Sequence, residues 1–319
     1  MSKWSVDDIP DQRGRTHVVT GANSGLGAEI ATALARANAH VIVACRDTRK
    51  GEQAAAAMAG NVEVRQLDLA DLASVRAFAE GIGEIAVLLN NAGIMATPLG
   101  RTKDGFELQI GTNHLGHFAL TGLLLPRITD RVVTMSSFGH RMGRIDLQDL
   151  NWERRRYARW QAYGQSKLAN LLFTYELDRR LARVGPRRRA LAAHPGYAAT
   201  NLQSHTDTVQ DTLMGVTNRL IAQSAPMGAL PALYAATVVD VPSGSFIGPD
   251  GPLELRGFPK VIRSNRRSYD ENTAAALWDL SEKLTGVTVP IRSDARSRLP
   301  LLSEPRSLRD DEHLKPVLP

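Results

Sequence analysis

The chain has 319 residues, of which 43% are hydrophobic and 23% charged, a composition typical of a soluble globular enzyme. Its net charge of +6 would suit a nucleic-acid or acidic surface, but no nucleic-acid-reading motif accompanies it, which favours a solvated Arg-rich surface. The single cysteine, Cys45, excludes an internal disulfide and a Cys-based metal site.

The sequence predicts no signal peptide and no membrane span. Residues 1–10 carry charge and lack an apolar run. Nowhere do about 18 apolar residues follow one another, the length that a spanning helix needs. Together with the lone cysteine, these features predict a cytoplasmic protein.

Short apolar runs alternate with longer amphipathic stretches along most of the chain. The expected strands are residues 16–20, 40–45, 62–67, 85–89, 131–135, 189–193 and 245–247. The expected helices are residues 25–37, 49–58, a stretch opening at 71, 104–125 and 160–183. Continuous apolar strands separated by helices predict an α/β, doubly wound Rossmann fold with a seven-stranded parallel sheet flanked by helices on both faces.

No linker or internal repeat divides this pattern, so residues 1–289 are predicted to form a single domain. A polar, Arg-rich insertion, residues 138–159, lies between the fifth strand and its helix. Residues 290–319 are rich in Pro, Arg and Ser with little periodicity, and are predicted to form an extended C-terminal arm or a partly disordered tail.

A glycine-rich turn joins the first expected strand to the first helix. Its glycines permit a tight turn and close backbone approach to a pyrophosphate, whose charge a helix N-terminus favours. Because this turn lies between an apolar strand and an Ala-rich helix, it is stronger evidence for a nucleotide site than the glycine spacing alone. The residues expected to contact the nucleotide here are Gly21, Asn23, Ser24, Gly25, Leu26 and Gly27.

The Gly-x-x-x-Gly-x-Gly spacing and further motifs in the same order resemble the short-chain dehydrogenase/reductase family in its compact form. The resemblance runs from about residue 13 to residue 286. The further motifs are Asp68-Leu69, Asn90-Asn91-Ala92-Gly93, Asn113, Ser136-Ser137, Tyr163-x-x-x-Lys167 and His194-Pro195-Gly196. The resemblance implies a nicotinamide-dependent oxidoreductase that interconverts an alcohol and a carbonyl.

The same resemblance assigns further cofactor contacts. They are Asp68 and Leu69 at the adenine, Asn90, Ala92 and Gly93 near the ribose, and Pro195 and Gly196 after the sixth strand. Strand-end Asn and Gly residues also have a simpler interpretation as turn formers. Thr200 resembles the residue that contacts the nicotinamide amide or the pyrophosphate, although it could instead cap the next helix.

The end of the second strand predicts the choice between NADP(H) and NAD(H). An acid there would bind the ribose hydroxyls of NAD, whereas an arginine suits a 2′-phosphate. Arg46 follows the strand directly, which predicts NADP(H). In the alternative, Arg46 is a surface residue and Asp47 turns inward to the ribose, which would favour NAD(H).

Tyr163 and Lys167 are four residues apart and share one face of the expected helix. A free tyrosine titrates near ~10, and a nearby ammonium and oxidised nicotinamide favour phenolate. By resemblance, Tyr163 is the general acid/base, and Lys167 lowers its pKa and binds the nicotinamide ribose. Tyr157 has Gln161 four residues later, so it cannot form this pair.

By the same resemblance, Ser137 orients the substrate oxygen and Asn113 holds a relay water beside the catalytic lysine. His114 and His117 have a helical spacing that could suit a metal, but no carboxylate companion is evident, which favours packing. His140 follows the serine closely enough to touch substrate.

Twenty-five residues separate Ser137 from Tyr163, a long interval for this family. The insertion resembles the retinol-dehydrogenase-like and WW-domain-oxidoreductase-like branch, which implies hydrophobic alcohols, aldehydes or ketones. Residues 201–227 are expected to form a lid over an apolar pocket. The resemblance also implies a homo-oligomer formed through the helices near Asn113 and Tyr163.

The sequence therefore predicts an NADP(H)-dependent oxidoreductase for an apolar alcohol/carbonyl substrate, with neither nucleic acid nor a membrane span involved. The alternative is a non-catalytic NADP(H)-binding redox sensor or scaffold. Loss of the catalytic tyrosine or lysine would favour that alternative, and both residues are present.

Overall fold

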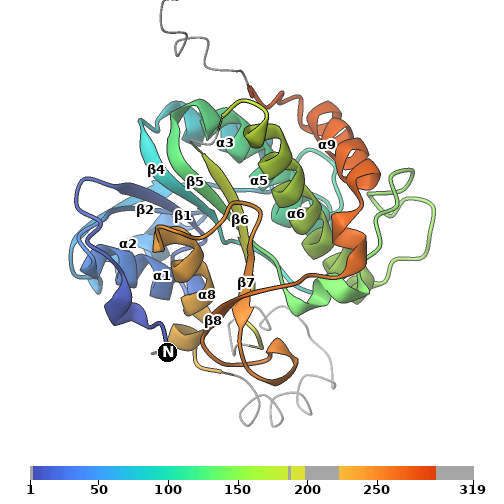
Figure 1. The fold of residues 1–319 in the computed structure, drawn as a ribbon. Coiled ribbons are helices and arrows are strands. Elements are labelled where there is room, and N and C mark those ends of the chain that lie inside the picture. The colour runs from blue at the N-terminus through green and yellow to red at the C-terminus, as the bar shows by residue number, and fades with distance from the viewer. Residues whose placement is uncertain (1–2, 186–187, 198–222, 292–319) are drawn as a thin grey trace, which may run out of the picture.

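The computed structural model describes residues 3–185, 188–197 and 223–291, which build one eight-stranded sheet with the order β3-β2-β1-β4-β5-β6-β7-β8 (Figure 1). The strands are β1 (Thr16–Thr20), β2 (His40–Cys45), β3 (Asn61–Gln66), β4 (Ile85–Asn90), β5 (Ile128–Met135), β6 (Arg189–Ala193), β7 (Phe246–Pro249) and β8 (Pro259–Ile262). All neighbours pair in parallel except β7 and β8, which are antiparallel.

Helices cover both faces of the sheet (Figure 1). The α-helices are α1 (Gly25–Arg36), α2 (Thr48–Ala56), α3 (Leu72–Glu80), α4 (Leu108–Ile110), α5 (Gly116–Leu124), α6 (Arg159–Ala182), α8 (Ala225–Thr237) and α9 (Glu271–Thr285). Apolar side chains of α1 and α8 pack on one face, and those of α3, α5, α6 and α9 pack on the other. Buried strands such as β4, with no polar alternation, are what a two-faced core requires.

The predicted doubly wound α/β fold is confirmed, but the sheet differs in its strand count and in the direction of one edge strand. The sheet has eight strands and not seven, because residues 259–262 add an antiparallel edge strand beside β7. This strand is short, begins with a proline and is only partly buried. Proline is tolerated at such an edge position, where its missing N–H breaks no ladder bond.

The helix expected from residue 104 begins later, at Leu108, and is not uniform. Gly105 has a φ of +83°, which a right-handed helix cannot contain, and the Asp104 carboxylate instead accepts a hydrogen bond from the Leu72 amide. After α4, the chain forms a π-helical turn, Gly111–Leu115, before α5. Such widened turns are rare and occur frequently at functional sites.

Helix α9 packs against α5 and α6, the two helices expected to form an interface between subunits. Trp278 of α9 is 2% exposed, stacks on Phe173 of α6 with 5.7 Å between ring centroids, and meets Phe118 of α5 edge-on at 5.2 Å. Part of the apolar surface of α5 and α6 is therefore covered by α9 within the chain, and the oligomer expected through these helices stays a prediction.

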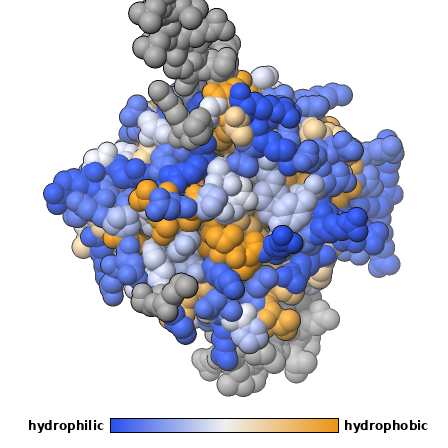
Figure 2. Space-filling model, in the orientation of Figure 1, coloured by the Kyte–Doolittle hydropathy of each residue, from blue (hydrophilic) through white to orange (hydrophobic). Residues whose placement is uncertain are grey.

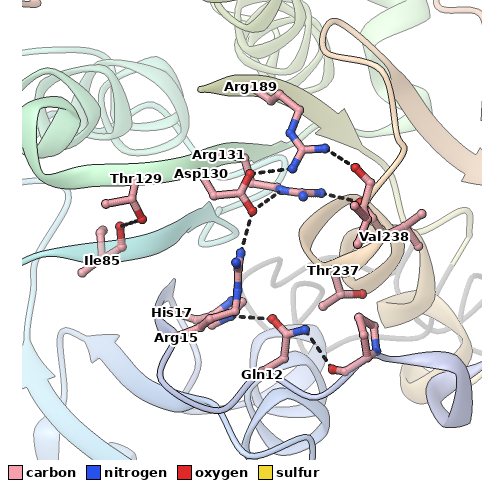
Figure 3. A network of polar contacts seen from close by, with 12 residues as sticks. Gln12, Arg15, His17, Ile85, Thr129, Asp130, Arg131, Arg189, Thr237 and Val238 are labelled. Carbon is pink, nitrogen blue, oxygen red and sulfur yellow. Dashed lines mark hydrogen bonds and ion pairs between the residues drawn. The ribbon is translucent and has the colours of Figure 1, made fainter. Parts of the chain in front are cut away.

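A charged cluster ties together the amino ends of the central strands (Figure 3). Asp130 forms ion pairs with Arg15 just before β1, with its neighbour Arg131, and with Arg189 at the start of β6. Arg131 is buried, and its Nη1 also donates to the carbonyl oxygens of Ala235 and Val238 at the end of α8. The cluster joins α8 to the sheet.

The face shown in Figure 2 is largely hydrophilic, with separate apolar patches. Within the described ranges, no helix combines the length and the apolar character needed to cross a membrane.

Candidate active site

The glycine turn between β1 and α1 approaches the loop after β4 very closely. Gly21 has a φ of +67°, and a Cβ on it would lie 2.9 Å from the Ala92 Cβ. A Cβ on Gly27 would collide with the Gly21 carbonyl oxygen and the Asn91 side chain. Only glycine fits these two places, so the chain keeps bare backbone where a pyrophosphate would lie.

A cleft of about 850 Å³ opens at the carboxyl ends of β1, β2 and β4. This position beside the sheet's crossover is where open α/β sheets bind nucleotides. Its lining contains most of the residues predicted to hold the cofactor: Gly21, Asn23, Ser24, Gly25, Leu26, Gly27, Arg46, Asp68, Leu69, Ala92 and Gly93. The donor-rich turn, the small residues and the cationic rim fit a dinucleotide.

Arg46 is exposed at the rim of the cleft, whereas Asp47 is the N-cap residue of the adjacent helix α2. The Asp47 carboxylate caps α2 by accepting a hydrogen bond from the Lys50 amide at 3.2 Å. A capping carboxylate stabilises its helix by ~1 kcal/mol, so turning it toward a ribose would cost that bond. Arg46, Lys50 and Asp47 all line the cleft, and of these Asp47 is engaged in a helix cap.

The paired asparagines at the end of β4 face different ways: Asn90 is its last residue and Asn91 follows it. Asn90 is fully buried, and its amide donates to the hydroxyls of Thr121 and Thr134, so its side chain braces helix and strand. Asn91 lines the cleft instead, and its amide donates to the Thr20 carbonyl at 2.8 Å. The side chain predicted to meet the cofactor thus points into the core, and its neighbour takes the cleft position.

Tyr163 and Lys167 lie one turn apart on α6, both buried, with the ammonium 5.8 Å from the centre of the phenol ring. The Lys167 ammonium donates to the Met135 carbonyl at the end of β5. A Cβ on Gly93 would lie 3.2 Å from the ammonium nitrogen, so the loop after β4 passes directly over the lysine. Strand ends and loop therefore fix the lysine beside the cleft.

Burial dominates the titration of this pair. It raises the pKa of Tyr163 to about 12, although the hydrogen bond from Ser137 acts in the opposite direction. It lowers the pKa of Lys167 to about 8. The sequence predicted a lowered tyrosine pKa beside a lysine and an oxidised nicotinamide; in the protein alone, desolvation outweighs the Ser137 hydrogen bond and the pKa is raised.

Ser137 follows β5 and faces the phenol. Its hydroxyl hydrogen-bonds Tyr163 and accepts a bond from the Gly139 amide at 3.2 Å. Gly139 lies against the phenol ring, since a Cβ there would be 2.9 Å from it. His140 is fully buried and its ring bonds the Ser137 carbonyl at 2.6 Å, so it supports the serine turn and does not face substrate. Ser136 is committed elsewhere, to the Lys167 carbonyl.

Asn113 sits in the π-helical turn and joins the catalytic helix to the loop after β4. Its side-chain oxygen accepts from the Ile94 amide, and its amide donates to the Ile94 carbonyl and to the Ser166 hydroxyl. A Cβ on Gly93 would lie 3.2 Å from its side-chain oxygen, the same distance as from the lysine ammonium. Asn113 is therefore beside Lys167, as the resemblance implied.

Comparison with known proteins agrees with this arrangement. Residues 15–211 match the family model for short chain dehydrogenase. The chain is 42% identical to human retinol dehydrogenase 13 over 87% of this chain and 86% of that protein, and 40% identical to mouse retinol dehydrogenase 12 over 86% and 87%. A crystal structure of an uncharacterized protein from Mycobacterium paratuberculosis is 56% identical, with a TM-score of 0.80, and covers 91% of this chain and 100% of that one.

The chain belongs to the short-chain dehydrogenase/reductase family. It falls in the retinol-dehydrogenase-like branch that its insertion predicted. In this short-chain dehydrogenase/reductase, the insertion is built around Asp149, whose carboxylate accepts the amides of Glu153, Arg154 and Arg155. The Arg155 guanidinium covers the Trp152 ring at 3.7 Å and donates to Gln165 of α6, which fastens the insertion to the catalytic helix.

Some predicted residues lie away from the cleft or outside the described part of the chain. Pro195 and Gly196 follow β6 at the same edge of the sheet but do not line the cleft. Thr200 and residues 201–222 of the predicted lid are outside the described residues, as are residues 292–319 of the predicted arm.

Two residues that contact the site, Thr20 and His117, were not identified from the sequence as functional candidates. Thr20, the last residue of β1, accepts the amides of both Asn91 and Ala92 with its hydroxyl. His117, interpreted from spacing as a packing residue, contacts Thr20 and the backbone of Asn113. His117 lies on α5 and the catalytic Lys167 on α6, so no sequence spacing connects them, and the contact of His117 with the end of β1 depends on the fold.

Proposed function

We propose that this short-chain dehydrogenase/reductase is an NADP(H)-dependent oxidoreductase that interconverts an alcohol and a carbonyl. One observation carries the proposal: the Tyr163 phenol and the Ser137 hydroxyl are paired, and the Lys167 ammonium one turn along the same helix lies against Gly93, which lines the glycine-rich cleft. A proton donor, an oxyanion donor and a cation in one place are what carbonyl reduction requires.

Each residue has a distinct task in the proposed reaction. When bound, the nicotinamide would supply or accept the hydride. Ser137 donates a hydrogen bond to the reacting oxygen and stabilises charge on it. Tyr163 delivers the proton to that oxygen during reduction and removes it during oxidation. Lys167 holds the nicotinamide ribose and favours phenolate, and Asn113 holds the water through which the proton is replaced.

Arg46 supports the choice of NADP(H). It stands at the cleft rim with Lys50 and forms no ion pair with an acid within the described residues, while Asp47 is committed to its helix cap. A 2′-phosphate would be recognised there by charge-assisted bonds. Arg46→Ala should weaken NADPH binding at least tenfold and leave NADH binding within twofold. Equal affinity of the unaltered protein for both cofactors would contradict the assignment.

An apolar substrate is favoured by the side chains beside the catalytic residues. Phe138 directly follows Ser137 and is 38% exposed, and Trp160, 41% exposed, meets the Tyr163 ring edge-on at 6.4 Å. Exposed aromatic rings so close to a reacting group suit an apolar partner. A panel of aldehydes, ketones and quinones, followed by NADPH oxidation, should show turnover that rises with substrate hydrophobicity. Turnover of small charged compounds alone would contradict this part.

Tyr163→Phe tests the proposed chemistry. The variant should bind NADPH as before but lose turnover by at least about 10²-fold, because the proton donor is removed. Tyr175→Phe is the matched control: this tyrosine lies on the same helix, and its hydroxyl bonds Ser264 away from the cleft. If Tyr163→Phe turns over at the unaltered rate, the proposal is wrong. If the unaltered protein binds NADPH and reduces no member of the panel, a sensor or scaffold role is favoured.

A further inference from the structure

His117 connects the end of β1, next to the glycine turn, with Asn113, whose side chain contacts the catalytic helix α6. It stands at the second position of α5, directly after the π-helical turn, and is 1% exposed. Its Nδ1 lies 3.0 Å from the Asn113 carbonyl oxygen, and its Nε2 lies 2.9 Å from the Thr20 hydroxyl. The ring therefore spans the gap between β1 and the π-helical turn.

The hydrogen positions in this bridge follow from which atoms can donate. A carbonyl oxygen only accepts, so Nδ1 of His117 carries the proton and Nε2 presents a lone pair. The Thr20 hydroxyl accepts the amides of Asn91 and Ala92 at 2.9 Å each, which uses both of its lone pairs. Its one hydrogen is then given to His117, since the other acceptor in reach, the Leu89 carbonyl, is farther away at 3.4 Å.

Every donor and acceptor in the bridge is satisfied only when the imidazole is neutral with its proton on Nδ1. The pKa of His117 is consistent with this state, because burial lowers it to about 4. A second proton on Nε2 would point at a hydroxyl oxygen whose lone pairs are already occupied. The ring thus has one tautomer and one orientation throughout the neutral pH range.

Each end of the bridge belongs to a different part of the machinery. At Thr20 the ring fixes the hydroxyl that holds the loop of Asn91 and Ala92 against the glycine turn, where the cofactor is expected. At Asn113 it fixes the backbone of the turn whose side chain bonds Ile94 and Ser166 beside Lys167. Neither end needs the other for its own local bonds, but the ring sets the distance between them.

We propose that His117 is a positioning residue that holds the cofactor-binding loop in register with the proton-relay turn at Asn113. The inference rests on the proposed function, because it assigns a role to the relay. It gives His117 two separable contributions: the Nε2 bond supports cofactor affinity, and the Nδ1 bond supports proton transfer.

Two amide variants separate these contributions. In His117→Asn, the side-chain amide nitrogen takes the place of Nδ1 and keeps the bond to the Asn113 carbonyl, but nothing reaches Thr20. In His117→Gln, the longer side chain brings its oxygen to the place of Nε2 and keeps the Thr20 bond, but the Nδ1 donor is lost. His117→Leu removes both bonds. For each variant we would measure the Kd for NADPH by fluorescence titration, kcat, its solvent deuterium isotope effect, and the urea midpoint.

The expected results differ by variant. His117→Asn should raise the Kd for NADPH about fivefold, the equivalent of one hydrogen bond, and keep kcat within twofold. His117→Gln should keep Kd within twofold, lower kcat at least fivefold and increase the solvent isotope effect. His117→Leu should show both losses. A purely structural role would shift the urea midpoints and leave Kd and kcat within twofold in both amide variants, and that result would overturn the proposal.

Loss of both readouts to the same degree in His117→Asn and His117→Gln would also overturn it, because the two ends would then not be separable. Failure of the proposed function is visible separately, as a lack of carbonyl reduction by the unaltered protein. In that case, the Kd values for NADPH still test the role of His117. A Kd that rises in His117→Asn and not in His117→Gln supports the bridge, and equal Kd values in both overturn it.

Discussion

Replacing Asp130 by asparagine should destabilise the protein far more than the loss of one surface ion pair. Its carboxylate serves three arginines, with nitrogen–oxygen distances of 2.5 Å to Arg15, 3.1 Å to Arg131 and 2.6 Å to Arg189 (Figure 3). The Arg131 side chain is 2% exposed, whereas those of Arg15 and Arg189 are 35% and 23% exposed. If the carboxylate is removed, water can therefore solvate Arg15 and Arg189 but not Arg131.

The magnitude follows from this difference. Partly exposed pairs contribute at most about 1 kcal/mol each, because water solvates the freed arginine. Arg131 cannot be solvated, and removing one partner of a buried pair costs about 3–5 kcal/mol. An asparagine can still accept one hydrogen bond, so we expect Asp130→Asn to lower the free energy of unfolding by about 3 kcal/mol. Arg15→Ala, the matched control, should lower it by about 1 kcal/mol or less.

Urea unfolding followed by far-UV circular dichroism measures both variants. Turnover should be unchanged, because the cluster lies at the amino ends of the strands and the cleft lies at their carboxyl ends. If Asp130→Asn loses no more stability than Arg15→Ala, the assignment of a buried charge that depends on Asp130 is wrong. Loss of turnover at full stability would contradict the separation of cluster and cleft.

The effect of pH on this variant has a definite sign. Burial acts to raise the pKa of Asp130, but Arg131, Arg189 and Arg15 outweigh it and lower the pKa below its usual value. A lowered folded-state pKa stabilises the protein above the unfolded-state pKa, about 3.9, and this stabilisation is lost as pH falls through the folded value. The difference between Asp130→Asn and the unaltered protein should therefore shrink below about pH 4.

Three further outcomes are expected. NADPH affinity should fall as pH rises through about 8, where the Lys167 ammonium loses its proton; an affinity constant to pH 9 in fluorescence titrations would contradict this. Trp278→Ala should cost about 3–5 kcal/mol in urea unfolding, because its ring is 2% exposed and stacks on Phe173. Tyr157→Phe should cost about 1–3 kcal/mol, since its hydroxyl bonds the fully buried Glu107 carboxylate at 3.0 Å, and an unchanged urea midpoint would refute that.

Strands with an unbroken apolar run were predictable, and the edge strand was not. β4 reads IAVLLN and is buried along its whole length, so local composition alone marks it. β8 reads PKVI and is only partly buried, and it exists as a strand because β7 offers it antiparallel partners. Pairing of this kind is a tertiary effect that a periodicity analysis does not contain.

The site was predictable as a set of motifs, but the direction of individual side chains was not. Asn90 and Asn91 are identical in chemistry, but Asn90 ends β4 and donates into the core, whereas Asn91 begins the loop and lines the cleft. The raised pKa of Tyr163 depends on how completely Gly139 and the surrounding elements exclude water from the phenol. Burial of this kind belongs to the assembled structure.

The covering of α5 and α6 by α9 bears most directly on how the enzyme is assembled. The sequence predicted an oligomer through these helices by resemblance, yet their apolar faces already hold Trp278 between Phe118 and Phe173. His114 of the π-helical turn also bonds the Ser281 hydroxyl of α9 at 3.0 Å, in a fully buried contact. A second subunit docking here would have to displace a buried indole and a buried hydrogen bond, which together stabilise the fold by several kcal/mol. The helix that completes the core behind the catalytic residues therefore covers part of the surface that the resemblance assigned to a neighbouring subunit, and the oligomer itself stays a prediction.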